Sequence, residues 1–379
     1  GKILISMRVS FTNLIKASEY KEKKFKKKII NGISKLISKN QFVGGQEVIK
    51  FEEAFKKYTK TSNCISVANG TDALEIALEV LDLPKNSQVI LPVNTWISTA
   101  EAVTRNGLKT VFCDVNLYDY SINLKDLKKK ISRNTSAIIP VHLYGYPSDL
   151  IGIKKIVRGR NIKIIEDCAQ AHGTKINEQH VGTFGDIGTF SFFPGKNLGA
   201  FGDAGGIITN SKNLAEKCRR LRNHGALKKY DHKFVGRNSR LDSLQCFVLY
   251  SKLKTYNFKI KKRNLLAKIY LEKLKGINGL YLPSLDFKKN KNSFHQFVIR
   301  VKKKRDKLIN FLNKNKISTM IHYPYMLNEL SFYKKCNGIK TLKNSKNLGK
   351  KILSLPISEE HTEKEINFIC KKIRYFFEN

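Results

Sequence analysis

Short apolar runs alternate with amphipathic segments through the first 250 residues, and no other feature of this chain restricts its fold as strongly. The apolar runs predict buried strands at CISVA (64–68), VILP (89–92), TVFCDV (110–115), SAIIPVHLYG (136–145) and IKIIEDCA (162–169). Between them, ALEIALEVL (73–81) and STAEAVTRNG (98–107) have helical periodicity. Strands that alternate with helices favour an α/β fold with a mainly parallel sheet and helices on both faces.

The pattern changes after residue 250. A long lysine-rich helical stretch (251–275) is followed by the strand-like SFHQFVIRV (293–301) and then by further helical segments. A chain of 379 residues is long enough for two structural units. We therefore predict a large domain over residues 1–250, N-terminal helices included, and a smaller C-terminal α/β domain over residues 251–379.

The formal net charge is +40, from 71 Lys and Arg against 31 Asp and Glu. One interpretation is binding to nucleic acid or a membrane surface; the other is a lysine-rich composition spread over every solvated face. We favour the second, because the charge runs from Lys16 to Lys372 and the densest run, YKEKKFKKKII (20–30), fits an amphipathic helix. There is no recognition-helix motif and no aromatic-basic stacking pattern, so no nucleic-acid partner is expected. Such a surface would attract anionic small substrates.

The seven cysteines are odd in number, scattered, and form no CxxC pair. This argues against a disulfide framework or a cysteine-ligated metal and predicts a cytoplasmic protein without a metal site. No apolar run is long enough for a membrane helix, and no membrane partner is expected. Gly1–Ser6 has no signal-peptide pattern, and Met7 is the natural start that we expect.

The segment ANGTDALEIALEVL (68–81) follows a predicted strand and opens a predicted helix. Gly70 allows a tight turn there. Thr71 and Asp72 occupy the first helical turn, where free backbone N–H groups and the helix dipole favour a phosphate. The alternative is a simple N-cap, because Thr and Asp are common capping residues.

A second polar group follows the strand that ends in IIEDCAQAHG (164–173). Glu166, Asp167, Gln170 and His172 come just beyond this apolar strand, where α/β proteins bind ligands. An acidic residue at that place can hold a proton on a cationic ring nitrogen. A turn capped by Asp167 is an equally good interpretation.

Trp96, in VNTWIST, is the only tryptophan and follows another predicted strand. Its planar ring could stack on a flat cofactor. Taken alone, a single tryptophan at such a place is better interpreted as a half-buried core aromatic.

Lys196 lies in FSFFPGKNLGAFGDAGG (190–206), after a predicted strand that ends in a Pro-Gly turn. Ser191 comes five residues before it, and glycines surround it. Glycine-rich backbone lets a ligand approach closely. A lysine at the edge of a buried sheet can be desolvated, which lowers its pKa and provides a nucleophilic amine. This context separates Lys196 from the many surface lysines.

A phosphate site, an aromatic ring, an acidic partner for a ring nitrogen and a reactive lysine are what pyridoxal phosphate (PLP) requires. At these motifs, and from about Phe11 to the C-terminus, the chain resembles the DegT/DnrJ/EryC1/StrS family of PLP-dependent nucleotide-sugar aminotransferases. Further motifs carry the resemblance: QFVGGQEVIKFEEAF (41–55), LRNHG (221–225), GRNSRLDSLQ (236–245) and HYP (322–324). The resemblance implies the aspartate aminotransferase-like fold, PLP fold type I, with a mainly parallel seven-stranded sheet and a smaller C-terminal α/β domain.

The resemblance also implies roles for single residues. Lys196 would be the Schiff-base lysine and would move the substrate proton, while Asp167 would bind the pyridine nitrogen. Gln170 would bind the ring hydroxyl, and Trp96 would stack on the ring. The phosphate would be held by Gly70, Thr71, Asp72 and Ser191, and Asn238 would complete the phosphate site of the partner subunit in a homodimer with shared active sites. His322 and Tyr323 would contact the substrate.

The implied reaction is transamination of a nucleotide-linked keto sugar, with glutamate as the amino donor and pyridoxamine phosphate (PMP) as the alternate cofactor form. KNLGAFGDAGG after the lysine resembles the C3-aminating subgroup, so we expect a dTDP-linked 3-keto-6-deoxyhexose. A UDP-linked 3-keto sugar and a 4-keto sugar are the alternatives. Ala204 and the segment YMLNEL (325–330) depart from the family pattern where the sugar nucleotide would pack. A sugar dehydratase is disfavoured, because that branch has histidine in place of Lys196.

Overall fold

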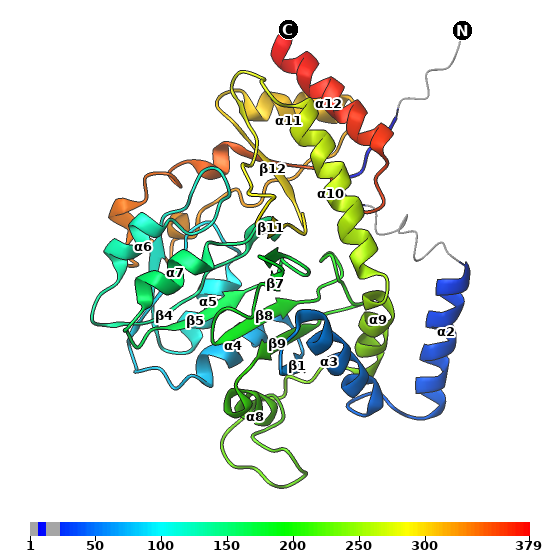
Figure 1. The fold of residues 1–379 in the computed structure, drawn as a ribbon, viewed down its shortest axis with the longest axis vertical. Helices are drawn as coiled ribbons and strands as arrows, with labels where there is room; N and C mark the ends of the chain where they lie inside the picture. The colour runs from blue at the N-terminus through cyan, green and yellow to red at the C-terminus, as the bar shows by residue number, and fades with distance from the viewer. Residues whose placement is uncertain (1–6, 13–22) are drawn as a thin grey trace.

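The computed structural model describes residues 7–12 and 23–379. Gly1–Ser6, the segment before the expected Met7 start, and residues 20–22 of the densest basic run lie outside the described residues. A seven-stranded sheet forms the centre of the molecule (Figure 1). In spatial order its strands are β1 (Asn63–Val67), β9 (Gly205–Thr209), β8 (Ile187–Ser191), β5 (Lys163–Asp167), β4 (Thr135–Ile138), β2 (Gln88–Pro92) and β3 (Lys109–Cys113).

The sheet is mainly parallel, as expected. From β8 to β3 every neighbouring pair is parallel, while β9 runs antiparallel to both β1 and β8. The α/β class and the aspartate aminotransferase-like architecture are therefore confirmed. All the parallel strands end at the same edge of the sheet, where ligands bind in folds of this kind.

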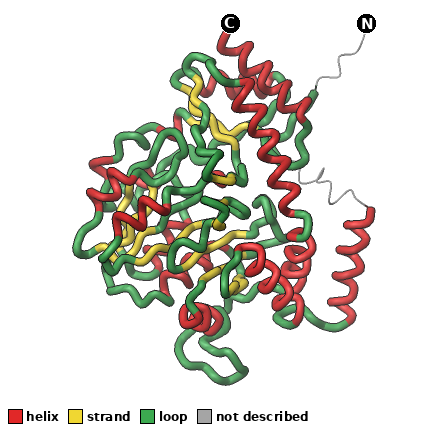
Figure 2. Tube along the Cα trace, in the orientation of Figure 1, coloured by secondary structure: helices red, strands yellow, loops and turns green. Residues whose placement is uncertain are grey.

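Helices pack on both faces of the sheet, because successive strand residues point to opposite sides. Ile207 belongs to one buried cluster and Ile208 to the other. Figure 2 shows the strands enclosed by helices in this way. One face carries α4 (Gly70–Glu79), α5 (Ser98–Arg105) and α8 (Lys212–Leu221), and the other carries α3 (Gln46–Thr59), α6 (Leu124–Lys130), α7 (Leu150–Val157) and α9 (Ser243–Leu253). Helix α2 (Lys23–Ser38) lies beside α9.

The C-terminal third is built around a second, three-stranded sheet. Its antiparallel strands are β10 (Leu280–Tyr281), β12 (Phe297–Val301) and β13 (Ile352–Leu355), accompanied by α10 (Tyr256–Lys273), α11 (Arg305–Lys314) and α12 (Glu363–Glu378). A third small sheet joins β11 (Asn290–Lys291) to β6 (Lys175–Ile176) and β7 (Gln179–His180). Single 3₁₀ turns complete the chain: η1 (Leu143–Gly145), η2 (Leu327–Glu329), η3 (Ile339–Thr341) and η4 (Leu348–Lys350).

Three predicted elements differ in extent. The strand-like segment 293–301 forms a strand only from Phe297, as β12. The strand expected over 136–145 ends at Ile138, because Pro140 has no N–H to donate and the chain then turns, with Tyr144 in the left-handed region at φ 62°. The helix expected over 251–275 is two helices, α9 and α10, separated at Lys254–Thr255. Helix α9 runs across residues 250 and 251, between which the domain boundary was predicted. The division into two domains at this point stays a prediction.

Residues 7–12 pack on the C-terminal part of the chain. Val9 forms a parallel bridge with Ile317, and the Ser10 carbonyl accepts a hydrogen bond from His361 Nε2 at 2.8 Å. The Phe11 ring lies 5.7 Å from the ring of His322. The start of the described chain therefore contributes to the side of the site formed by the C-terminal part.

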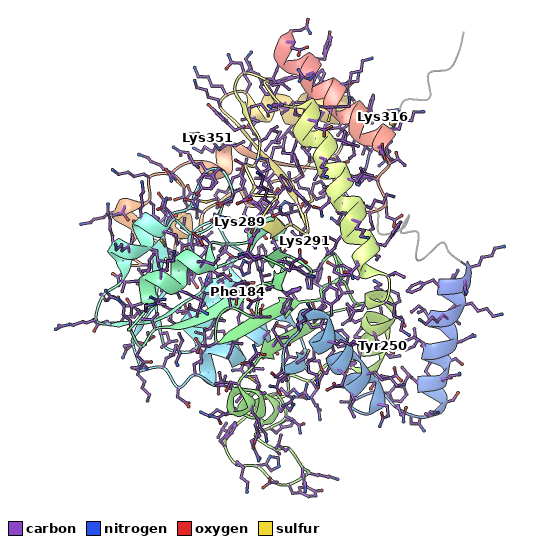
Figure 3. The ribbon with its side chains drawn as sticks, viewed as in Figure 1. Phe184, Tyr250, Lys289, Lys291, Lys316 and Lys351 are labelled. Atoms are coloured by element: carbon purple, nitrogen blue, oxygen red, sulfur yellow. The ribbon has the colours of Figure 1, made fainter. Side chains whose placement is uncertain are left out.

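Exposed lysines occur along the whole described chain, from Lys24 through Lys109 and Lys212 to Lys371. The lysines labelled in Figure 3, Lys289, Lys291, Lys316 and Lys351, come from three separate segments of the C-terminal third. Among residues 7–12 and 23–379, no helix is both long and apolar enough to cross a bilayer. All seven cysteines are free thiols, and six of them are buried.

Candidate active site

The residues singled out in the sequence gather at the carboxyl edge of the large sheet. Asp167 is the last residue of β5, and Ser191 is the last residue of β8. Helix α4 begins just after β1, and its N-terminal glycine lies against Ser191: a Cβ added at Gly70 would come within 2.7 Å of Ser191 Cβ. Strands far apart in sequence thus bring three predicted site residues together.

The first turn of α4 is arranged as an anion site. Asn69 is the N-cap, and its side chain accepts a hydrogen bond from the Asp72 backbone N–H at 2.8 Å. The N-cap interpretation therefore holds for Asn69 rather than for Thr71 or Asp72. Thr71 donates to Ser98 Oγ at 2.8 Å, so its hydroxyl is fixed in direction. The positive end of the helix dipole then faces the space beside Ser191 and favours a phosphate there.

Asp167 is buried and held by two hydrogen bonds. Its Oδ1 accepts from the Ala169 backbone N–H at 3.1 Å and its Oδ2 from Thr99 Oγ1 at 2.9 Å. Burial raises the pKa of this carboxyl, although both hydrogen bonds and the nearby Lys196 act in the opposite direction. A buried carboxylate of this kind is stabilised by a cationic N–H partner.

Lys196 is half-buried on the turn that follows β8. Desolvation lowers the pKa of its amine to about 8. The negative charge of Asp167 raises this pKa, but by less than desolvation lowers it. About one tenth of this amine is therefore neutral, and nucleophilic, at pH 7, far more than for an ordinary lysine.

The lowered pKa predicts a distinctive labelling profile for Lys196. Only the neutral amine reacts with an acylating reagent, so labelling at Lys196 should rise about tenfold between pH 7 and pH 9 and be half-maximal near pH 8. Exposed lysines in the same digest, quantified by peptide mass spectrometry, serve as the internal reference. Labelling at Lys196 that is still far from its maximum at pH 10 would contradict this assignment.

The C-terminal part of the chain closes the site opposite Asp167. Gln170 accepts from the Tyr144 backbone N–H at 2.7 Å and donates to the Tyr323 hydroxyl at 3.0 Å. The ring of Tyr323 lies 5.3 Å from the ring of Trp96, which is 55% exposed and so is not the core aromatic that a lone tryptophan suggested. His322 bonds Ser354 Oγ through Nδ1 at 2.8 Å, and burial lowers its pKa to about 4, which keeps the ring neutral.

Asn238 lies apart from these contacts, as an exposed residue on the surface of its own chain. Its Oδ1 accepts from Arg240 Nε at 3.0 Å, and its backbone forms an antiparallel bridge with Asn223. An exposed position is what a residue that reaches into a neighbouring subunit needs, and the role remains a prediction.

Two residues near the site, Thr99 and His295, were missed in the sequence, while Asn197 was expected there only as part of the segment that follows Lys196. Thr99, which orients Asp167, is one helical turn along from the Asn-Thr-Trp motif. Asn197 donates to the Ser293 carbonyl at 2.9 Å and bonds His295 Nδ1 through its Oδ1 at 3.0 Å. The only sequence signal for His295 was an isolated histidine within a strand-like segment.

Glu166, which the sequence placed beside Asp167, has a structural role. Its two oxygens accept from the backbone N–H groups of Gly182, Phe184 and Gly185 and from His142 Nε2 at 3.0 Å. The His142 tautomer is fixed, because its Nδ1 accepts from the Ser148 N–H. His142, Glu166 and Cys168 place possible metal ligands within 4.8 Å of one another. Both oxygens of the Glu166 carboxylate already accept hydrogen bonds, so its burial is explained without a metal.

Comparisons with known proteins agree with this site. The model of the DegT/DnrJ/EryC1/StrS aminotransferase family matches residues 23–374. A UDP-N-acetyl-3-dehydro-alpha-D-glucosamine 3-aminotransferase of Acidithiobacillus ferrooxidans is 38% identical over 91% of this chain and 93% of its own. A dTDP-3-amino-3,6-dideoxy-alpha-D-galactopyranose transaminase of Aneurinibacillus thermoaerophilus is 36% identical over 93% and 96%. The crystal structure of S. venezuelae DesV in complex with a ketimine intermediate superimposes with a TM-score of 0.93, at 32% identity over 98% and 99%.

The fold and these relatives define a PLP-dependent sugar aminotransferase. The chain belongs to the DegT/DnrJ/EryC1/StrS aminotransferase family.

The residues present fit PLP. Gly70 leaves no room for a side chain between α4 and Ser191, which keeps the helix N-terminus open to a phosphate. Asp167 offers a buried carboxylate for a cationic ring nitrogen, and Lys196 offers an amine of lowered pKa. Each part of the cofactor thus has a chemically matched group at this edge of the sheet.

Proposed function

We propose that this protein transfers an amino group from glutamate to C3 of a nucleotide-linked 3-keto sugar. A dTDP-linked 3-keto-6-deoxyhexose is the first choice and a UDP-linked 3-keto sugar the second, because the relatives above carry both kinds of name. The observation that carries the C3 proposal is that these relatives are named for amination at C3, in agreement with the KNLG segment after Lys196; in this structure Asn197 of that segment is held by Ser293 and His295. A rigid KNLG segment beside the reactive amine would limit which sugar carbon can approach it.

The side chains divide the chemical work. When bound, PLP supplies an electron sink for a carbanion at the reacting carbon. Asp167 would keep the ring nitrogen protonated, and Thr99 would hold Asp167 in the direction needed. Lys196 would carry the proton between carbon atoms as general base and then general acid, with a pKa of about 8 that suits both roles. Trp96 would stack on the ring, and Gln170 would bind its hydroxyl.

Substrate and phosphate contacts complete the proposal. Gly70, Thr71, Asp72 and Ser191 would hold the cofactor phosphate, and His322 and Tyr323 would contact the sugar nucleotide or glutamate. Neutral His322 can accept as well as donate a hydrogen bond, which suits hydroxyl recognition. We further propose a cytoplasmic location, which reduced cysteines would suit.

The position of amination can be tested directly. Purified protein is offered matched 3-keto and 4-keto sugar nucleotides, in dTDP-linked and UDP-linked form, with glutamate. We expect nitrogen at C3 of a 3-keto substrate, located by NMR of the product. Efficient amination of the 4-keto sugars alone would overturn the C3 proposal and leave the aminotransferase class intact.

A homodimer with shared sites predicts complementation between inactive subunits. If Asn238 binds the cofactor phosphate of the partner subunit, a mixed dimer of Lys196→Ala and Asn238→Ala subunits contains one intact site. It should recover about half of the activity of the wild-type dimer, since one of its two sites is complete. Activity is measured after subunit exchange has been verified by mass. Exchange without recovery would argue that Asn238 does not serve the partner.

A further inference from the structure

Asn238 lies in a short extended segment, residues 237–239, that pairs with residues 221–224. The Arg237 N–H donates to the Leu221 carbonyl at 2.8 Å, and the Ser239 N–H donates to the Arg222 carbonyl at 2.9 Å. Side chains alternate along an extended backbone. Arg237 and Ser239 therefore share one side of this segment, and Asn238 occupies the other.

The side of the segment that carries Arg237 and Ser239 packs on helix α4. Asp72, Glu75 and Glu79 are spaced at i, i+3 and i+7, so their carboxylates lie along one helical face. Ser239 Oγ donates to Asp72 Oδ2 at 2.6 Å. Arg237 binds both of the others, with Nη1 to Glu75 Oε2 and Nη2 to Glu79 Oε2, each at 2.6 Å.

Arg237 is well suited to hold this segment in one orientation. Its planar guanidinium joins two carboxylates one helical turn apart, a geometry that a lysine ammonium cannot reproduce. Glu75 is buried and is also approached by Arg105 Nε at 3.1 Å. The chain just before the segment is open to solvent, with Val235 92% exposed and Tyr230 81% exposed. Without the Arg237 side chain, the segment would keep its backbone pairing with residues 221–224 and the Ser239–Asp72 hydrogen bond, but it would lose both contacts with Glu75 and Glu79 on α4.

We propose that Arg237 is a positioning residue for the cofactor site of the partner subunit. By fixing residues 237–239 on α4, it directs Asn238 away from its own helix and so orders it before the cofactor binds. This inference rests on the proposed function, in which Asn238 completes the phosphate site of the partner. Because α4 also begins at the phosphate site of its own subunit, one helix supports both sites of the dimer.

The first test is cofactor affinity. PMP, which binds without a covalent bond to Lys196, is titrated into enzyme stripped of cofactor while the fluorescence of Trp96, the only tryptophan, is followed. Arg237→Met should raise the Kd about tenfold, the equivalent of one charge-assisted hydrogen bond. Arg237→Lys should recover only part of this loss. Arg374→Met removes an ion pair with Glu378 on α12 and hydrogen bonds to the carbonyls of Lys273 and Lys275, none of them a contact of the site, and should stay within about twofold of wild type. An unchanged Kd for Arg237→Met would overturn the proposal.

The second test asks which subunit is affected. Two mixed dimers are compared at a cofactor concentration near the wild-type Kd. The first pairs an Arg237→Met subunit with a Lys196→Ala subunit; its only site with Lys196 receives Asn238 from the subunit that retains Arg237. The second pairs wild type with a subunit carrying both substitutions; its only site with Lys196 receives Asn238 from the subunit that lacks Arg237. We expect near-normal activity for one site in the first dimer and reduced activity in the second.

The reverse result, with the first dimer impaired and the second normal, would show that Arg237 acts within its own subunit and would overturn the proposal. The same two arrangements are run with Asn238→Ala in place of Arg237→Met. If Asn238 acts on the partner and Arg237 does not, only this inference fails. If Asn238 also acts within its own subunit, the shared site in the proposed function fails.

Discussion

Replacing Lys196 by alanine should reduce transamination by about 10⁴-fold or more while the protein stays folded. The substitution removes both the amine that binds the cofactor covalently and the group that moves the substrate proton. The folded state should not lose stability, because burial of the charged amine destabilises the folded protein, and this destabilisation lowers the pKa of Lys196 to about 8. Activity, thermal unfolding, and cofactor release after denaturation and filtration are measured in parallel.

The matched control is Lys85→Ala. Lys85 is exposed and precedes β2, at the opposite edge of the sheet from Lys196, so its loss should leave activity unchanged. Wild-type turnover by the Lys196→Ala protein would remove the basis of the site assignment. An unfolded Lys196→Ala protein would show instead that the amine is needed for the fold.

Asp167→Asn should lower the rate by about 10²-fold to 10³-fold or more with little change in the amount of cofactor bound. The side chain keeps its size, but an amide carries no charge to hold a proton on the ring nitrogen, and stabilisation of the developing charge is lost. The amide also keeps only one acceptor oxygen for the two donors that meet Asp167, the Thr99 hydroxyl and the Ala169 N–H, so the two hydrogen bonds cannot both persist unchanged. Single-turnover rates with glutamate and bound cofactor by absorbance are the measurements.

Two further variants serve as a control and as a comparison for the rate of Asp167→Asn. Asp82→Asn removes an exposed carboxylate that pairs with Lys217 outside the site, and it should be silent. Thr99→Val leaves the Asp167 charge and removes one of its two hydrogen bonds, together with the contact between the Thr99 and Thr95 hydroxyls, so a loss of about tenfold is expected, equivalent to about 1.4 kcal/mol. A rate for Asp167→Asn within about tenfold of wild type would reject its role at the ring nitrogen.

Local sequence patterns predicted the elements that carry the chemistry. The strands around β2, β3 and β5 were recognisable because continuous apolar runs are what a doubly covered parallel strand requires. Asp167 and Lys196 could be found because each lies at or just after the end of such a strand, and all parallel strands end at one edge of the sheet. The overlong strand at 136–145 shows the limit, since apolar residues continue past Ile138 into a buried turn and burial alone does not distinguish the two.

The sequence by itself therefore determined the α/β class and predicted Lys196 and Asp167 as the reactive lysine and its acidic partner, since each prediction depends on hydrophobic periodicity and on the residue types at the end of a strand. Only the tertiary structure decided how the site is held. Thr99 reaches Asp167 across 68 residues, Gln170 reaches Tyr323 across 153, and Arg237 reaches Glu75 across 162. Such contacts join side chains whose local sequences carry no common pattern. Which side chains meet depends on how α4, α5 and the C-terminal part pack around the sheet. Local patterns in a single sequence do not predict that packing.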